Sequence, residues 1–139
     1  MYIWEIESSL EKWEEISGKI EYILEKQNFS TNFIVSVLLA TDELFTNISR
    51  YAYGEKTGMV NVCAEIDGAT GKCEITFSDY GMKFNPLEYT DKPYIDENNP
   101  HRIKPGGWGI FMAKQQVDEL KYENVDGMNR LTLIKRECV

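Results

Sequence analysis

Several features that commonly indicate a protein's class are scarce in this chain of 139 residues. There is a single histidine, His101, in a proline-rich segment, so the sequence supports neither a Ser-His-Asp nor a Cys-His catalytic arrangement. Lys and Arg form no cluster and the formal net charge is −8, which argues against nucleic acid and against an anionic membrane as partners. No apolar run is long enough to span a bilayer, and Met1–Ile6 lacks the basic start of a signal peptide. We therefore expect a cytoplasmic protein.

Cysteine and proline are also sparse. Three cysteines, Cys63, Cys73 and Cys138, are an odd number without metal-ligand spacing, which predicts reduced thiols. All four prolines fall between residues 85 and 105, in a stretch without clear periodicity, and such stretches are often binding loops or lids. The remaining composition, 42% hydrophobic and 27% charged, is that of a globular protein, and the length predicts one domain over residues 1–139.

Apolar periodicity predicts how helices and strands follow one another. Residues 2–6 and 60–66 alternate as strands do, whereas the apolar residues of 10–24 and 31–52 recur at helical spacing. The other predicted features are a helix start with a Ser8–Glu11 capping box, a strand over 73–78, a helix after Gly109 and a final hairpin turning at Asp126-Gly127. Helices and strands are thus segregated, which predicts an α+β fold: a two-layer sandwich with helices on one face of a mixed, mainly antiparallel sheet.

The stretch from Ala40 to Tyr53 carries a carboxylate and a carboxamide one helical turn apart, Glu43 and Asn47. At about 100° per residue the two share one side of the helix, roughly opposite an apolar line. A Glu and an Asn in this arrangement could hold a hard metal ion and orient a nucleophile. They could equally be two solvated residues on an outer face, and in isolation the pattern favours this second interpretation.

Two further motifs are ambiguous when each is taken singly. Asp79-Tyr80-Gly81 ends a hydrophobic strand, where a carboxylate could accept a hydrogen bond from the exocyclic amine of a purine; Asp and Gly are also the usual residues of a turn. Gly106-Gly107-Trp108-Gly109 precedes a helix, whose exposed amides favour phosphate, but a glycine-rich loop end needs no ligand.

The order in which these motifs occur is more specific than any of them alone. The sequence resembles the ATP-binding superfamily shared by DNA gyrase, MutL and the histidine kinases (GHKL). It is most similar to the anti-sigma factor serine/threonine kinases of bacterial partner-switching systems. The resemblance covers nearly the whole chain and is carried by DELFTNISRYAY, SDYGMKFNP, GGWGIFMAKQQVDELKYE and NRLTLIKRE. It implies the Bergerat-type ATP-binding fold of that superfamily.

The resemblance also implies a role for each motif in binding ATP and Mg²⁺. Asn47 would coordinate Mg²⁺, and Glu43 would orient or deprotonate the attacking hydroxyl. Asp79 would recognise the adenine amine, with Gly81 beside the base. The remaining implied contacts are to the phosphates, from the lid glycines Gly106, Gly107 and Gly109 and from Arg50, for which a surface role is equally consistent.

Three positions depart from the pattern of the family. Lys83 replaces a glycine, Tyr51 replaces a histidine, and the threonine that many relatives place on the last strand is absent, with Asn129 or Arg130 near its position. These departures do not remove the nucleotide site that the resemblance implies.

By the same resemblance the chain is expected to be an ATP-dependent kinase that phosphorylates an anti-anti-sigma (STAS-type) protein and binds a sigma factor, and to form a homodimer as relatives commonly do. One alternative is a non-catalytic nucleotide-dependent binding module. A histidine-kinase catalytic domain is a weaker alternative, because the chain has no helical phosphoacceptor segment.

Overall fold

The computed structural model describes residues 1–54, 56–89 and 107–138. The elements in these ranges are β1 (Tyr2–Glu7), α1 (Leu10–Lys26), α2 (Thr31–Tyr51), β2 (Met59–Asp67), β3 (Lys72–Asp79), the 3-10 helix η1 (Pro86–Tyr89), α3 (Gly107–Gln116), β4 (Glu119–Val125) and β5 (Met128–Arg136). The bounds of α2 and β2 agree with the predicted ranges to within one residue. The predicted irregular segment from 85 to 105 lies mostly outside the described residues, as does His101.

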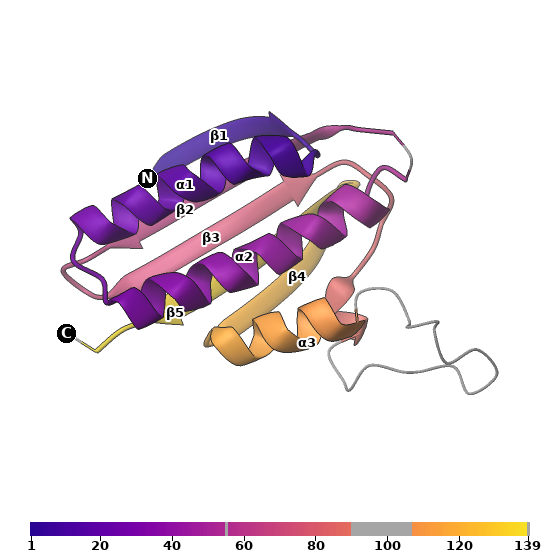
Figure 1. Ribbon diagram of the computed structural model, residues 1–139. Helices are drawn as coiled ribbons and strands as arrows, with labels where there is room; N and C mark the ends of the chain where they lie inside the picture. The colour runs from indigo at the N-terminus through magenta and orange to yellow at the C-terminus, as the bar shows by residue number, and fades with distance from the viewer. Residues whose placement is uncertain (55, 90–106, 139) are drawn as a thin grey trace.

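The five strands form one sheet in the order β1-β2-β3-β5-β4. All three α-helices cover the same face of this sheet, which confirms the predicted α+β sandwich (Figure 1). The prediction of a mixed sheet is wrong, because every neighbouring pair among the described strands is antiparallel. β3 and β4 run in the same direction, but β5 lies between them and pairs with both.

α1 begins later than the capping-box pattern predicts. Its N-cap is Ser9, whose Oγ accepts a hydrogen bond from the Lys12 amide at 3.3 Å. Ser8 is buried and pairs with the loop before β2: its amide donates to the Gly58 carbonyl (2.8 Å) and the Gly58 amide donates to Ser8 Oγ (3.1 Å). The predicted Ser8–Glu11 box is therefore wrong, since a tertiary contact uses the hydroxyl that would have formed it.

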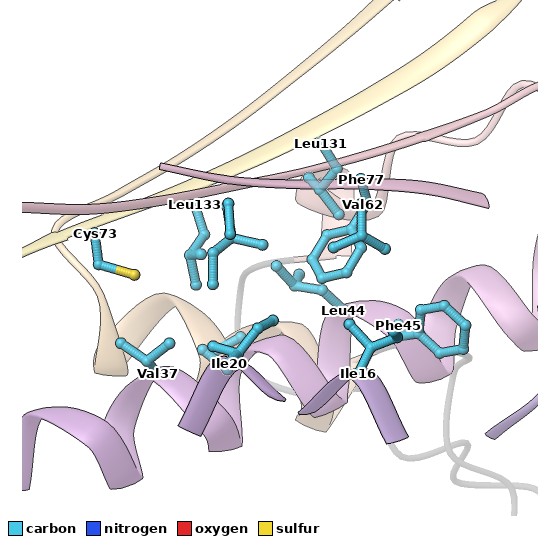
Figure 2. Close-up of a cluster of buried hydrophobic side chains, with 14 of the residues drawn as sticks. Ile16, Ile20, Val37, Leu44, Phe45, Val62, Cys73, Phe77, Leu131 and Leu133 are labelled. Carbon is cyan, nitrogen blue, oxygen red and sulfur yellow. The ribbon is translucent and has the colours of Figure 1, made fainter. Parts of the chain in front are cut away.

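The core lies between the helices and the sheet, and α2 contributes much of it. Figure 2 shows Leu44 facing Phe77, Val62 and Leu131. The Phe45 ring lies with its centroid 6.3 Å from that of Phe77. Phe45 also stacks on Trp13 of α1 with ring centroids 4.9 Å apart, and Trp13 Nε1 donates to Asp42 Oδ1 at 2.7 Å. Burying an aromatic or aliphatic side chain of this size contributes about 1.5–3 kcal/mol each. The half of α2 that carries Glu43 and Asn47 is thus held firmly by packing.

The thiol of Cys73 is part of this core and is expected to be inert in the folded protein. Burial raises its pKa to about 12 from an ordinary 9.0, so at pH 8 its thiolate fraction is about 10³-fold lower than that of an exposed thiol. Its contribution to stability is present below pH 9 and is lost as the pH rises towards 12.

A variant that retains Cys73 alone should react with a thiol reagent only after denaturation, whereas one that retains the exposed Cys138 should react in the native state. Equal native rates for the two variants would contradict the buried placement.

Candidate functional site

Asn47 lies on the side of α2 that α3 covers, and only 5% of it is exposed. Its Nδ2 donates to the Glu43 carbonyl at 2.8 Å. Its Oδ1 is buried and has no hydrogen-bond partner within the described part of the chain. The interpretation of the pair as solvated outer-face residues is therefore wrong for Asn47. Buried polar atoms are nearly always satisfied, so this oxygen indicates a missing donor or cation.

The first turn of α3 lies against both residues of the pair. A side-chain carbon at Gly109 would collide with Glu43 Oε2 and would lie 3.7 Å from Asn47 Nδ2, so a larger residue there would displace the Glu43 carboxylate. Gly107 is the first residue of α3. The glycine-rich motif was expected to precede the helix, whereas Gly107 and Gly109 form its first turn; Gly106 lies outside the described residues.

Asp79 ends β3 and is buried, with 4% exposed. Its Oδ1 accepts hydrogen bonds from the Gly81 amide at 2.9 Å and from Asn129 Nδ2 at 3.0 Å. Its Oδ2 accepts none from the residues that the structure describes. The carboxylate is thus fixed through one oxygen, and the other can accept a hydrogen bond from a ligand.

The turn after Asp79 is joined to the end of α2. The Met82 amide donates to the Ala52 carbonyl at 2.6 Å, and a side-chain carbon at Gly81 would collide with that carbonyl. The Tyr53 hydroxyl donates to the Met59 carbonyl at 2.7 Å and accepts from the Tyr80 amide at 3.2 Å. Partial burial raises the pKa of the Tyr53 phenol, so it keeps the proton it donates.

Asn47 and Asp79 both line a small cavity of about 20 Å³. Its lining is mainly apolar, with a few convergent polar groups. The lining residues are Leu44, Asn47, Ile48, Ala52, Asp79, Met82, Phe84, Pro86, Tyr122, Asn129 and Leu131. Arg50 is exposed on α2, forms no ion pair inside the described ranges and is not among these residues.

Among the lining residues that were not predicted as site residues, Asn129 and Tyr122 carry polar groups. Asn129 lies opposite Asp79 in the β3–β5 register and bonds to it directly. The alternation of inward and outward side chains along β5 could have identified Asn129 as buried. Asn129, Leu131 and Leu133 share the inward face of β5, so a polar residue there must be buried. The bond of Asn129 to Tyr122 on β4 depends on strand pairing and has no local signal.

A family model described as the histidine kinase-like ATPase domain matches residues 6–135. The chain belongs to this family of ATPase domains. Membership implies that it uses ATP, in agreement with the resemblance on which the site was predicted. No helix in the described ranges is long and apolar enough to cross a membrane.

Among curated relatives of this ATPase domain are proteins named serine-protein kinase RsbW. That of Staphylococcus epidermidis is 32% identical over 108 residues, which is 73% of this chain and 66% of the relative. That of Oceanobacillus iheyensis is 26% identical over 109 residues, which is 76% of this chain and 68% of the relative. The chain thus spans about two thirds of the length of these relatives.

A solved structure gives the same fold. The crystal structure of the RsbU and RsbW domains of a Mycobacterium tuberculosis protein matches with a TM-score of 0.63 and 16% identity, covering 98% of this chain and 32% of that one. At this identity the likeness shows the fold alone.

The contact between Gly81 and Ala52 gives a testable prediction. Gly81→Ala should lower the free energy of unfolding by about 1–3 kcal/mol, because the added methyl group collides with backbone atoms that cannot move separately. Gly18→Ala is the matched control, since nothing lies within 4 Å of its side-chain position, and in an exposed helix interior it should gain about 1 kcal/mol. Urea unfolding of both variants measures the difference. If Gly81→Ala had the same free energy of unfolding as wild type, the close approach of Gly81 to the Ala52 backbone would be wrong.

Proposed function

We propose that the chain is an ATP-dependent serine/threonine protein kinase that acts as an anti-sigma factor and phosphorylates an anti-anti-sigma protein. The relatives named serine-protein kinase RsbW support the activity. The observation that carries the proposal is the buried Asn47 Oδ1, which has no hydrogen-bond partner among the described residues; Asn47 and Asp79 line the same cavity. This arrangement supports a metal-bound phosphate beside Asn47 and a nucleobase beside Asp79 as the proposed ligand.

Asp79 is proposed to recognise adenine. Asp79 lines the cavity and its Oδ2 accepts no hydrogen bond from the described residues, which suits the exocyclic amine of the nucleobase, with Gly81 beside it. The proposed phosphate contacts are Gly107 and Gly109 in the first turn of α3 and Gly106, the preceding residue in the sequence, with Arg50 as a further candidate. Apolar residues of the cavity, such as Ile48 and Leu131, suit the faces of a purine ring.

The side chain of Asn47 fits Mg²⁺. Its amide nitrogen donates to the Glu43 carbonyl, which leaves the neutral Oδ1 without a partner among the described residues. Mg²⁺ prefers oxygen ligands and needs few from the protein. When bound, Mg²⁺ would neutralise charge on the phosphates.

Glu43 is proposed as the general base. Its half-buried carboxylate would take the proton of the substrate serine hydroxyl while the hydroxyl oxygen bonds to the γ-phosphorus. The bond from that phosphorus to the bridging oxygen breaks, and ADP leaves. Such transfer depends mainly on positioning and charge stabilisation, which the contact of Glu43 with the start of α3 serves.

The remaining expectations are also proposals. A STAS-type protein as substrate, a sigma factor as second partner, a homodimer and a cytoplasmic location are proposed from the sequence resemblance to the anti-sigma factor kinases. One domain over residues 1–139 is supported by the match to residues 6–135 and by the single sheet.

Removing the proposed base should abolish transfer but not binding. Glu43→Gln should lower the rate of phosphoserine formation on a STAS-type substrate by about 10²–10⁴-fold, while leaving ATP affinity within a few fold. Glu25→Gln, an exposed change on α1, is the matched control and should behave as wild type. Radiolabelled transfer and calorimetry measure the two quantities. A fully active Glu43→Gln would exclude Glu43 as the base. A wild type that binds ATP but phosphorylates no STAS-type partner would favour the binding-module alternative.

Removing the proposed metal ligand should make nucleotide binding insensitive to the metal. Wild type should bind ATP more weakly after chelation of Mg²⁺, whereas Asn47→Ala should bind equally weakly with and without it, because its oxygen ligand is gone. Asn61→Ala, an exposed position on β2, is the control and should keep the dependence. A metal dependence in Asn47→Ala equal to that of wild type would contradict the assignment.

A further inference from the structure

We propose that Tyr122 and Asn129 are positioning residues that set the preference of the site for a 6-aminopurine over a 6-oxopurine, by holding Asp79 through one oxygen. The inference rests on the proposed nucleotide site. It assigns a specificity role to two side chains on β4 and β5, one of which, Tyr122, makes no hydrogen bond to Asp79 among the described contacts.

Every hydrogen-bonding group of the Asn129 amide is used. Its Nδ2 donates to Asp79 Oδ1 and to the Met82 carbonyl, both at 3.0 Å. Its Oδ1 accepts from the Tyr122 hydroxyl and, at 3.2 Å, from Asn124 Nδ2. Only 5% of the residue is exposed. A fully satisfied amide of this kind supports its neighbours and has no capacity left for a ligand.

The donors on Asn129 Oδ1 fix which way the amide faces. If the amide turned over, its oxygen would face the carboxylate of Asp79 and its NH₂ group would face the NH₂ group of Asn124. Each of these two contacts would leave groups without a hydrogen-bond partner, which costs about 1–3 kcal/mol for each such group. Tyr122 and Asn124 therefore keep an N–H donor directed at Asp79.

The consequence for Asp79 is a difference between its two oxygens. Oδ1 receives the Gly81 amide and Asn129 Nδ2, so a ligand meets Oδ2, which can only accept. An amine at C6 of a purine donates to it. A keto oxygen at C6 would face the carboxylate instead, without a hydrogen bond and with repulsion between two acceptors. Sites that form a buried hydrogen bond with one substrate reject an analogue that cannot form it.

The Met82 carbonyl connects the same amide to the turn beside the base. Asn129 Nδ2 holds this carbonyl while the Met82 amide bonds to Ala52, so the turn is held from β5 and from α2. Loosening Asn129 should thus weaken recognition of the nucleobase more than it weakens phosphate binding near Asn47.

The test compares ATP with inosine triphosphate, which differs at C6 of the base. Calorimetry with Mg²⁺ on the full chain should give wild type a preference for ATP on the order of 10². Tyr122→Phe should reduce this ratio roughly three- to tenfold, since one hydrogen bond that orients Asn129 is lost. Asn129→Asp should reduce it by roughly tenfold or more, because a carboxyl group replaces the donor to Asp79. In both variants the affinity for ATP should fall while that for inosine triphosphate stays within about twofold.

Controls separate this role from a purely structural one. Tyr22→Phe, which removes an exposed hydroxyl from α1, should keep the wild-type ratio. If Asn129→Asp does not fold, Asn124→Ala removes the second donor and should lower the ratio in the same direction. Equal losses of affinity for both nucleotides, or an unchanged ratio in variants that fold, would overturn the inference and leave the nucleotide site standing. A folded wild type that binds neither nucleotide would overturn the proposed function as well.

Discussion

The contact between the end of α2 and the turn after β3 determines the geometry of the whole site. The Ala52 carbonyl accepts the Met82 amide, and the Tyr53 hydroxyl joins the start of β2 to the Tyr80 amide. α2 carries Asn47, the proposed metal ligand, and β3 ends at Asp79, the proposed adenine-binding carboxylate. These few hydrogen bonds therefore set the distance between the two residues. Phosphoryl transfer depends mostly on positioning, which makes such a contact between two elements more important than any one pair of charges.

The polar groups of the interior divide into those that are satisfied and those that are not. Asn129 uses all its hydrogen-bonding capacity within the protein, whereas Asn47 Oδ1 has no partner in the described ranges and Asp79 is bonded through Oδ1. Unmatched capacity at both ends of one cavity is the physical basis for assigning a ligand to it. The surrounding core is apolar and closely packed, so these exceptions stand out against it (Figure 2).

Local periodicity predicted the elements well, because helices and hairpins are encoded over short stretches. The Asp126-Gly127 turn, for example, has positive φ at both residues, as that pair of residue types predicts. What could not be predicted depends on contacts between distant residues. Asn47 is buried because α3 covers its side of α2, and Asn129 reaches Asp79 across fifty positions of sequence. Glu43, Asn47 and Asp79 were found only through their joint order, and their roles remain predictions.

In the proposed site, one Mg²⁺-nucleotide binds between Asn47 and Asp79. This can be tested by a crystal structure of the chain with Mg²⁺ and a non-hydrolysable ATP analogue. We expect a metal–oxygen distance of about 2.0–2.1 Å to Asn47 Oδ1 and the exocyclic amine of adenine within hydrogen-bond distance of Asp79 Oδ2. A nucleotide bound elsewhere, or bound here with its metal away from Asn47 and its base away from Asp79, would contradict it.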